Sequence, residues 1–243
     1  MLTWGAGIGM PDYSHTGLIL LWGFNPTATW LSQVAPIREA KRRGARLVVI
    51  DPRRQGLARS ADLWLGLRPG TDGALALGLA HLMLERGGAD ETFLRRYSDA
   101  AFLVRDDDGT LLTDVHVVGP EGTGAPMIWD ETLEVPVPCP KGELTPATAS
   151  LSGVRRVECR GTMVSCRPVL DTLRERCSHF PPDRVAEITG LRTEDIEQLA
   201  GWLSKCGPVS FFTWTGTAQH SNASQTTRCI NVLYALTGSL DAE

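Results

Sequence analysis

The order of strand-like and loop-like segments in residues 18–72 constrains the fold most strongly. Two short runs, LILLW at 18–22 and RLVVI at 46–50, are almost continuously apolar, as expected of strands buried on both faces of a sheet. The segment between them has a helical texture and ends at Gly44, a good C-terminal stop for a helix. A strand, a helix and a strand in this order form a βαβ unit, which is almost always right-handed. The sequence therefore predicts an α/β fold with a parallel sheet.

The loop after the first run contains Gly23, Asn25 and Pro26. Gly23 allows a sharp turn and a close approach of the backbone to a ligand. Asn25 offers an amide donor, and Pro26 suits the first turn of a helix. We therefore expect a helix over 27–43 whose N-terminus points at an anion. An ordinary strand-to-helix turn is the alternative, and this loop alone does not decide between them.

The loop after the second run contains Asp51, Arg53 and Arg54. In dinucleotide-binding folds, an acidic residue at the carboxyl end of the second strand accepts hydrogen bonds from ribose hydroxyls. The two arginines beside it are suited to neutralising phosphate. Alternatively, Asp51 caps the following turn and both arginines are solvated.

A third loop follows a loosely alternating run at 62–67. Pro69 and Gly70 signal a turn, and Asp72 precedes an apolar helical segment that starts near Gly73. Asp72 can cap that helix. Alternatively, its carboxylate can accept two N–H donors from the Watson–Crick edge of guanine. One carboxylate cannot fully serve both roles.

The motifs GFNP, IDPR and RPGTDGAL, in this order, resemble those of molybdopterin oxidoreductases of the dimethyl sulfoxide reductase and formate dehydrogenase type. The resemblance also takes in AEITG at 186–190, WTGTAQHSNA at 214–223 and LYALTG at 233–238, so it extends over nearly the whole chain. It implies bis-molybdopterin guanine dinucleotide with molybdenum or tungsten as the cofactor. The implied reaction is two-electron redox or oxygen-atom transfer on a small-molecule substrate.

The resemblance also implies which residues bind the cofactor. One dinucleotide would be lined by Trp22, Gly23, Asn25, Pro26, Thr29, Ile50, Asp51, Pro52, Arg53, Arg54, Gly70, Thr71 and Asp72, and a pterin portion would be approached by Thr215, Gly216 and Gln219. We expect residues 215–219 to follow a strand over 208–214 and to face the same cleft as Gly23 and Asp51, because open α/β sheets bind ligands beyond the carboxyl ends of their strands. No catalytic residue and no metal ligand is identified.

Family members usually carry an N-terminal cysteine cluster for an iron–sulfur centre, a metal ligand upstream of the first loop, and a C-terminal domain. We recognise none of these features in residues 1–243. We therefore expect an internal fragment whose partners are the missing N- and C-terminal domains and an electron-transfer subunit. A short stand-alone homologue is the alternative. A non-redox hydratase or hydroxyltransferase is the competing function within the family. Outside it, the alternatives are a non-catalytic nucleotide-binding module and a nicotinamide-dependent dehydrogenase, although the first strand lacks a following Gly-x-Gly-x-x-Gly.

We expect a Rossmann-like dinucleotide-binding α/β domain over 1–177 and part of a second α/β domain over 178–243. Within the first, residues 106–158 contain many Gly, Pro, Thr and Val residues and short β-like runs such as VHVV, MIWD and LEVPV. They predict an irregular β-containing insertion, which either serves substrate access or subunit contact or is a surface elaboration without chemistry. Helices are expected over 91–97, 167–178 and 222–236, and starting near 181 and 193.

Composition excludes several classes of partner. A net charge of -4 gives no general attraction for nucleic acid or anionic membranes, and no apolar stretch approaches a membrane span. The 6 cysteines form no Cys-x-x-Cys pair, so we expect scattered reduced thiols, several of them buried. His220 follows the last motif loop, where a structural helix-start role is expected. The substrate, the metal and the compartment, cytoplasmic or periplasmic, stay open.

Overall fold

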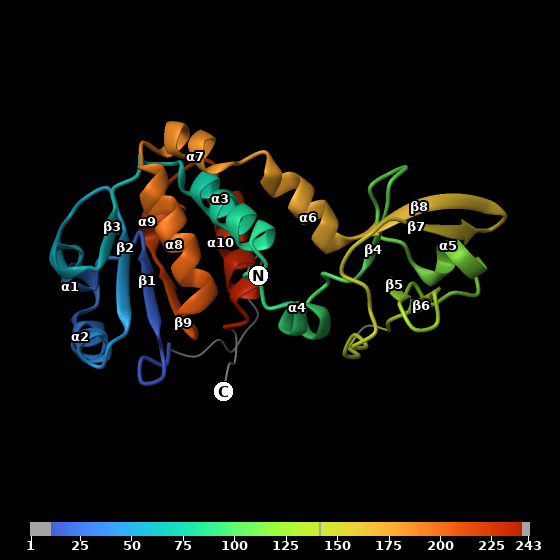
Figure 1. The fold of residues 1–243 in the computed structure, drawn as a ribbon, viewed down its shortest axis with the longest axis horizontal. Helices are drawn as coiled ribbons and strands as arrows, with labels where there is room; N and C mark the ends of the chain where they lie inside the picture. The colour runs from blue at the N-terminus through green and yellow to red at the C-terminus, as the bar shows by residue number, and fades with distance from the viewer. Residues whose placement is uncertain (1–10, 141, 240–243) are drawn as a thin grey trace. The chain divides into compact units, whose positions relative to one another are not determined.

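A parallel sheet of four strands organises the part of the molecule that carries the motif loops (Figure 1). The structure is a computed structural model and describes residues 11–140 and 142–239. These residues form two compact units, one of residues 11–89 and 177–239 and the other of residues 90–176.

The first unit contains the sheet and the helices that cover it. The strand order is β3-β2-β1-β9, and every pair is parallel. The strands are β1 (Leu18–Trp22), β2 (Arg46–Ile50), β3 (Leu63–Leu65) and β9 (Val209–Thr213). The helices are α1 (Pro26–Thr29), α2 (Val34–Arg42), α3 (Asp72–Glu85), α7 (Pro182–Thr189), α8 (Thr193–Lys205), α9 (Thr215–Ala218) and α10 (Ala223–Thr237), with 3₁₀ turns η1 (Leu31–Gln33) and η2 (Gly56–Ser60).

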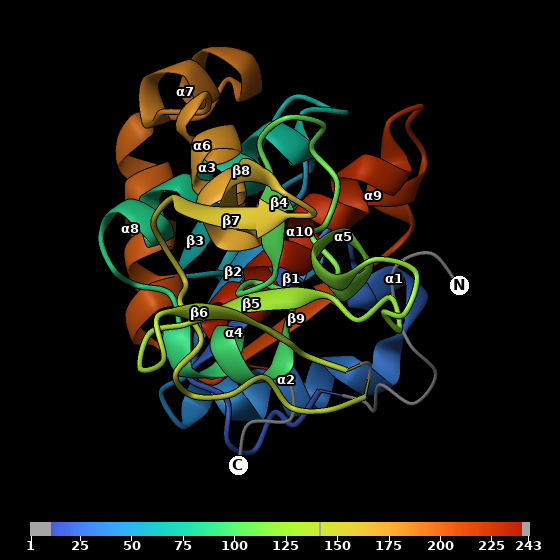
Figure 2. The same ribbon diagram turned by 90° about the vertical axis from the view of Figure 1, so that its right-hand side faces the viewer.

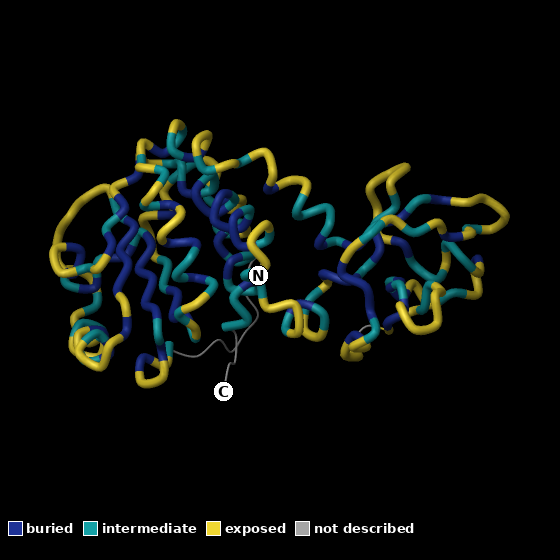
Figure 3. The backbone as a smooth tube through the Cα atoms, viewed as in Figure 1, coloured by how far each residue is buried: buried dark blue, intermediate teal, exposed yellow. Residues whose placement is uncertain are grey.

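Two layers of helices bury the sheet on both faces, as its continuous apolar strands require. Helices α1 and α2 lie on one side, and α3, α8 and α10 lie on the other (Figure 1). On the α2 side, Ile19 and Leu21 of β1 pack with Ile37 of α2 in one buried cluster. Every residue of β1 is buried, and Figure 3 shows the strands as the most buried part of this unit.

The predicted strands over 18–22, 46–50 and 208–214 are confirmed by β1, β2 and β9. The single helix predicted over 27–43 is wrong. Instead, α1 ends after one turn, η1 follows, and α2 begins at Val34. Trp30 has φ -152° and ψ 73°, outside the helical region, and Pro36 lacks the N–H that a continuous helix would donate to the carbonyl of Ser32.

The expected boundary near residue 178 does not separate two α/β domains among the described residues. Strand β9 pairs with β1 in the register Leu18↔Val209 to Trp22↔Thr213, so the C-terminal segment completes the N-terminal sheet. Helices α8 and α10 also pack on α3. Composition and motif order could not reveal this grouping, because it rests on pairing between strands that are far apart in the sequence.

The second unit is mainly antiparallel (Figure 2). Its elements are α4 (Glu91–Tyr97), β4 (Leu103–Arg105), α5 (Asp114–Val118), β5 (Met127–Asp130), β6 (Val135–Pro138), β7 (Arg155–Cys159) and β8 (Thr162–Pro168), and α6 (Val169–Ser178) spans the boundary between the units. The strands form a sheet of order β4-β8-β7 and a β5–β6 hairpin. The unit begins earlier and ends later than the predicted insertion of 106–158.

The β-like run VHVV is a helix, α5. Thr113 and His116 form a reciprocal capping box at its start. The Asp114 carboxylate accepts hydrogen bonds from the backbone N–H groups of Thr123 and Gly124, which ties the following loop back onto the helix. Local capping therefore overrides the β-propensity of the three valines. No helix in the described ranges has the length and apolarity that crossing a membrane would require.

Leu20 and Leu31 offer a matched test of the core. Leu20 is 0% exposed in the central strand, whereas Leu31 is 71% exposed in η1. We expect Leu20→Ala to lower the free energy of unfolding by about 2–5 kcal/mol, because it leaves a cavity between the helical layers. Leu31→Ala should change it by less than about 0.5 kcal/mol. Urea denaturation followed by circular dichroism measures both, and equal effects would contradict the described burial.

Candidate functional site

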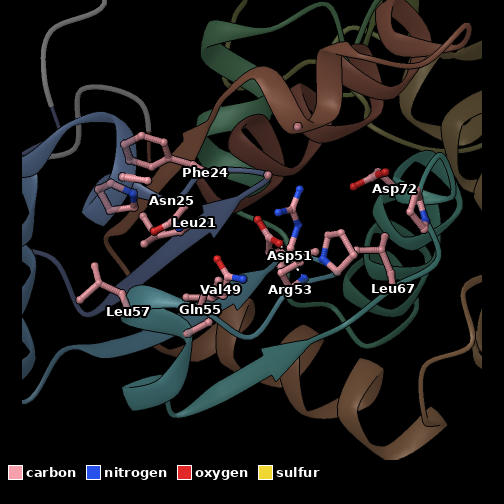
Figure 4. A pocket seen from close by; sticks show the side chains of 18 of the residues that line it. Leu21, Phe24, Asn25, Val49, Asp51, Arg53, Gln55, Leu57, Leu67 and Asp72 are labelled. Carbon is pink, nitrogen blue, oxygen red and sulfur yellow. Dashed lines mark hydrogen bonds between the residues drawn. The ribbon is translucent and has the colours of Figure 1, made fainter.

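A cavity of about 420 Å³ opens at the carboxyl ends of the parallel strands. The loops that follow β1, β2, β3 and β9 line it, which is where open α/β sheets bind ligands. Figure 4 shows Asn25 on one side of this cavity, Asp72 on the other, and Asp51 and Arg53 between them. Its lining residues are Leu21, Gly23, Phe24, Asn25, Pro26, Ala28, Val49, Ile50, Asp51, Pro52, Arg53, Gln55, Leu57, Ala58, Leu67, Pro69, Asp72, Gly216, Gln219 and His220.

Most residues predicted to bind a cofactor line this one cavity. They are Gly23, Asn25, Pro26, Ile50, Asp51, Pro52, Arg53, Asp72, Gly216 and Gln219. Trp22, Thr29, Arg54, Gly70, Thr71 and Thr215 belong to the same loops or strand ends but do not line it. The predicted meeting of residues 215–219 with Gly23 and Asp51 in one cleft is confirmed, although most of that segment is a short helix, α9, rather than a loop.

Two glycines hold the first and fourth loops together. Gly23 has φ +59°, and its carbonyl oxygen accepts a hydrogen bond of 3.1 Å from the N–H of Gly216. A Cβ atom on Gly216 would lie 2.7 Å from both Cα and O of Gly23. The two backbones therefore touch directly, and a side chain at Gly216 would have to push them apart.

Asn25 lies at the start of α1, but its side chain does not cap that helix. Its Oδ1 accepts a hydrogen bond of 2.6 Å from the Thr27 hydroxyl. The Asn25 backbone carbonyl accepts from the hydroxyl of Thr29, so Thr29 has a structural partner away from the cavity. Gly56 packs against this turn, since a Cβ there would lie 2.7 Å from Asn25 Oδ1. No described residue accepts a hydrogen bond from the Asn25 amide nitrogen, which could therefore donate to a ligand.

The Asp51 carboxylate accepts one backbone hydrogen bond, from the N–H of Arg53 at 2.7 Å. The alternative that Asp51 caps its own turn is therefore correct for Oδ1, while no described residue bonds to Oδ2. The side chains of the two neighbouring arginines have different surroundings. Arg53 lines the cavity, whereas the guanidinium of Arg54 lies 5.5 Å from the centroid of the Trp64 ring. Of these two arginines, Arg53 is the one that could meet an anion in the cavity.

Asp72 is the first residue of α3, so it does not cap a helix that begins at Gly73. The N-cap residue is Thr71, whose hydroxyl donates to the backbone oxygen of Arg68 at 2.6 Å. The Asp72 side chain instead accepts a 2.7 Å hydrogen bond on Oδ1 from the indole Nε1–H of Trp22. Asp72 is 7% exposed, and Trp22 is 1% exposed. A buried carboxylate thus forms part of the cavity wall, and the buried indole of Trp22 holds it in place by a hydrogen bond.

The loop that carries Asp72 is anchored to two other segments. Arg68 donates through Nη1 to the Glu187 carbonyl at 2.6 Å, and its N–H donates to the Thr189 carbonyl at 2.8 Å, both in α7. The Asn222 side chain donates to the Gly70 carbonyl at 3.1 Å. The AEITG motif and Asn222 therefore support the third loop.

Sequence reasoning missed several lining residues. Gln55, Leu57 and Ala58 carried no separate signal, because each is an ordinary residue beside a recognised motif, and Pro69 was identified only as a turn signal. His220 was identified only as a residue that follows the last motif loop, and its ring lines the cavity next to Gly70. Its signal is its position at the end of the fourth loop, since that loop returns to the carboxyl end of the sheet.

The cysteines are free, as predicted, and several are buried. Burial raises the pKa of the Cys177 thiol to about 12, so this thiol is unreactive at neutral pH. Within residues 11–140 and 142–239, no three His, Cys, Asp or Glu side chains gather closely enough to hold a metal ion.

Comparison with known proteins agrees with this architecture. Residues 4–243 match the family model for molybdopterin oxidoreductases. A Halobacterium salinarum protein provisionally described as a catalytic subunit of dimethyl sulfoxide reductase is 34% identical over 98% of this chain and 28% of its own length. A sulfite dehydrogenase subunit from Allochromatium vinosum is 32% identical over 96% of this chain and 27% of its own length.

A solved structure, acetylene hydratase from Pelobacter acetylenicus, shares the fold with a TM-score of 0.61 at 23% sequence identity; the match covers 96% of this chain and 23% of that one. The chain belongs to the molybdopterin oxidoreductase family. It spans about a quarter of the length of the curated relatives that it matches.

Gly216→Ala tests the contact between the first and fourth loops. We expect it to lower the free energy of unfolding by about 1–3 kcal/mol, because the new methyl group overlaps the Gly23 backbone. Gly201 in α8 is the matched control, since a Cβ there meets nothing within 4 Å. Gly201→Ala should leave stability unchanged or raise it by up to about 1 kcal/mol. Thermal and urea unfolding compare the two variants, and equal stability would refute the contact.

Proposed function

We propose that this cavity binds the guanosine diphosphate end of a molybdopterin guanine dinucleotide. The observation that supports it best is the buried Asp72 carboxylate in the cavity wall, because such a group needs donors from a ligand and guanine offers two on one edge. Adenine offers one donor and one acceptor there, so a fixed carboxylate would favour guanine.

The other lining residues fit the remaining parts of the nucleotide. Gly23 and Gly216 line the cavity, where their backbones would lie beside a pyrophosphate. Arg53 would neutralise its charge, and Asp51 Oδ2 would accept from a ribose hydroxyl. Gly216 lies in α9 and Gln219 directly follows that helix, and both would lie toward the pterin portion. These residues share one cavity, which is the property that a single extended ligand requires.

The family implies a molybdopterin cofactor that carries molybdenum or tungsten. When bound, that cofactor would supply two-electron redox or oxygen-atom transfer, while the residues of this chain would bind and orient it. We propose that this region is the cofactor-binding part of an oxidoreductase that acts on a small molecule. We further propose that the same enzyme uses an electron-transfer subunit and an iron–sulfur cluster, both outside residues 11–239.

Asp72→Asn tests the guanine assignment. The amide would present a donor where donors must be received, so at least one buried pairing is lost, at a cost of about 1–3 kcal/mol of binding free energy. Calorimetry with GDP should therefore show an affinity about 5- to 150-fold lower than that of the unsubstituted chain. Asp12→Asn, at an exposed carboxylate that pairs with His15, is the control and should bind normally. Unchanged affinity in Asp72→Asn would refute the guanine contact.

The neighbouring arginines give an internally matched test of phosphate binding. Arg53→Ala should weaken GDP binding about three- to tenfold and guanosine binding much less, because only GDP carries the diphosphate. The loss should shrink at high salt, since Arg53 is exposed. Arg54→Ala should leave GDP affinity unchanged, because its guanidinium lies over Trp64. If both variants lose affinity equally, the assignment of Arg53 to phosphate is wrong.

A further inference from the structure

Trp22 and Asp72 form a buried polar pair whose two members differ in their access to the cavity. Asp72 lines the cavity and Trp22 does not. Trp22 is the last residue of β1, and its indole N–H reaches the first turn of α3 to donate to Asp72 Oδ1 at 2.7 Å. The contact therefore joins the central strand of the sheet to the helix that carries the carboxylate.

The indole leaves acceptor capacity for a ligand. A carboxylate has about four lone-pair sites, and Trp22 occupies one of them. Oδ2 has no partner among the described residues. Because the Trp22 indole holds Oδ1, the carboxylate would present Oδ2 and the remaining lone pair of Oδ1 to the cavity as a fixed pair of acceptors.

Without the indole donor, the carboxylate would have other partners. Asp72 is the first residue of α3, where the N–H groups of Ala74 and Leu75 donate to the Thr71 carbonyl and the N–H group of Gly73 has no described acceptor. A carboxylate that rotated toward these groups would present fewer lone pairs to the cavity. Trp22 opposes that rotation, because its own buried N–H would then lose its only described partner, which is costly.

We infer that Trp22 is a positioning residue that sets the preference of this site for guanine over adenine. The inference rests on the proposed guanine contact of Asp72 and adds the group that orients it. A fixed pair of acceptors accepts both donors of the guanine edge and faces the N1 acceptor of adenine unfavourably. A freely rotating carboxylate would avoid that unfavourable contact and discriminate less.

The test measures GDP and ADP affinities of the whole chain by calorimetry for Trp22→Phe, Asp72→Ala and the double variant. Trp22→Phe keeps an aromatic ring and removes the donor. It should weaken GDP binding about tenfold and leave ADP binding nearly unchanged. In the Asp72→Ala background, Trp22→Phe should have no further effect, because the group it orients is gone. Additive losses, or equal losses for both nucleotides, would overturn the inference.

Trp202→Phe is the matched control, because Trp202 lies in α8 over Arg46 and does not line the cavity. It should retain the GDP preference. Asp72→Glu supplies a second test that keeps the indole and the charge but displaces the carboxylate by one methylene. It should lose the preference as Trp22→Phe does, and a preserved preference would overturn the inference.

Different results would refute the guanine contact of Asp72 and the positioning role of Trp22. If the unsubstituted chain binds GDP and ADP equally, the proposed guanine contact itself is wrong. If the unsubstituted chain and Trp22→Phe both prefer GDP to the same extent while Asp72→Ala does not, the guanine contact stands and the positioning role of Trp22 is refuted.

Discussion

The parallel pairing of β1 with β9 is the interaction on which the site depends. It sets Trp22 beside Thr213 and so brings two loops from distant parts of the sequence to the same edge of the sheet. The loops then meet through Gly23 and Gly216, whose backbones are too close for any side chain between them. Without this pairing, the cavity would lose the residues of its fourth loop. The requirement for glycine at these positions follows from the geometry of the sheet.

Strand positions and motif loops were predictable because they depend on local patterns. Apolar runs such as LILLW identify strands buried on both faces, and Gly, Pro, Asn and Asp identify the loops. The carboxyl-edge rule then predicts that these loops share one cavity, and Asn25 and Gln219 both line it. The family was predictable as well, because the order of the motifs along the chain is itself distinctive.

Features that depend on strand pairing between distant segments, on side-chain capping or on particular backbone angles were not predictable. The grouping of 177–239 with 11–89 depends on strand pairing, and the helical form of VHVV depends on a capping interaction and a returning loop. The break at Trp30 is a property of backbone angles that the residue types leave open. The partner of Asp72 was also missed, since nothing in the sequence indicates that a tryptophan indole reaches it. The two roles weighed for Asp72 were a cap and a guanine acceptor, and the structure uses Oδ1 for a third.

We propose that the cavity recognises a guanine nucleotide through a fixed pair of acceptors. Competition among GDP, IDP and ADP for the unsubstituted chain, measured by calorimetry at one ionic strength, tests it most directly. We expect GDP to bind most tightly, IDP to bind more weakly because it lacks the exocyclic amine, and ADP to bind most weakly. Equal affinities for the three nucleotides, or tighter binding of ADP than of GDP, would contradict it.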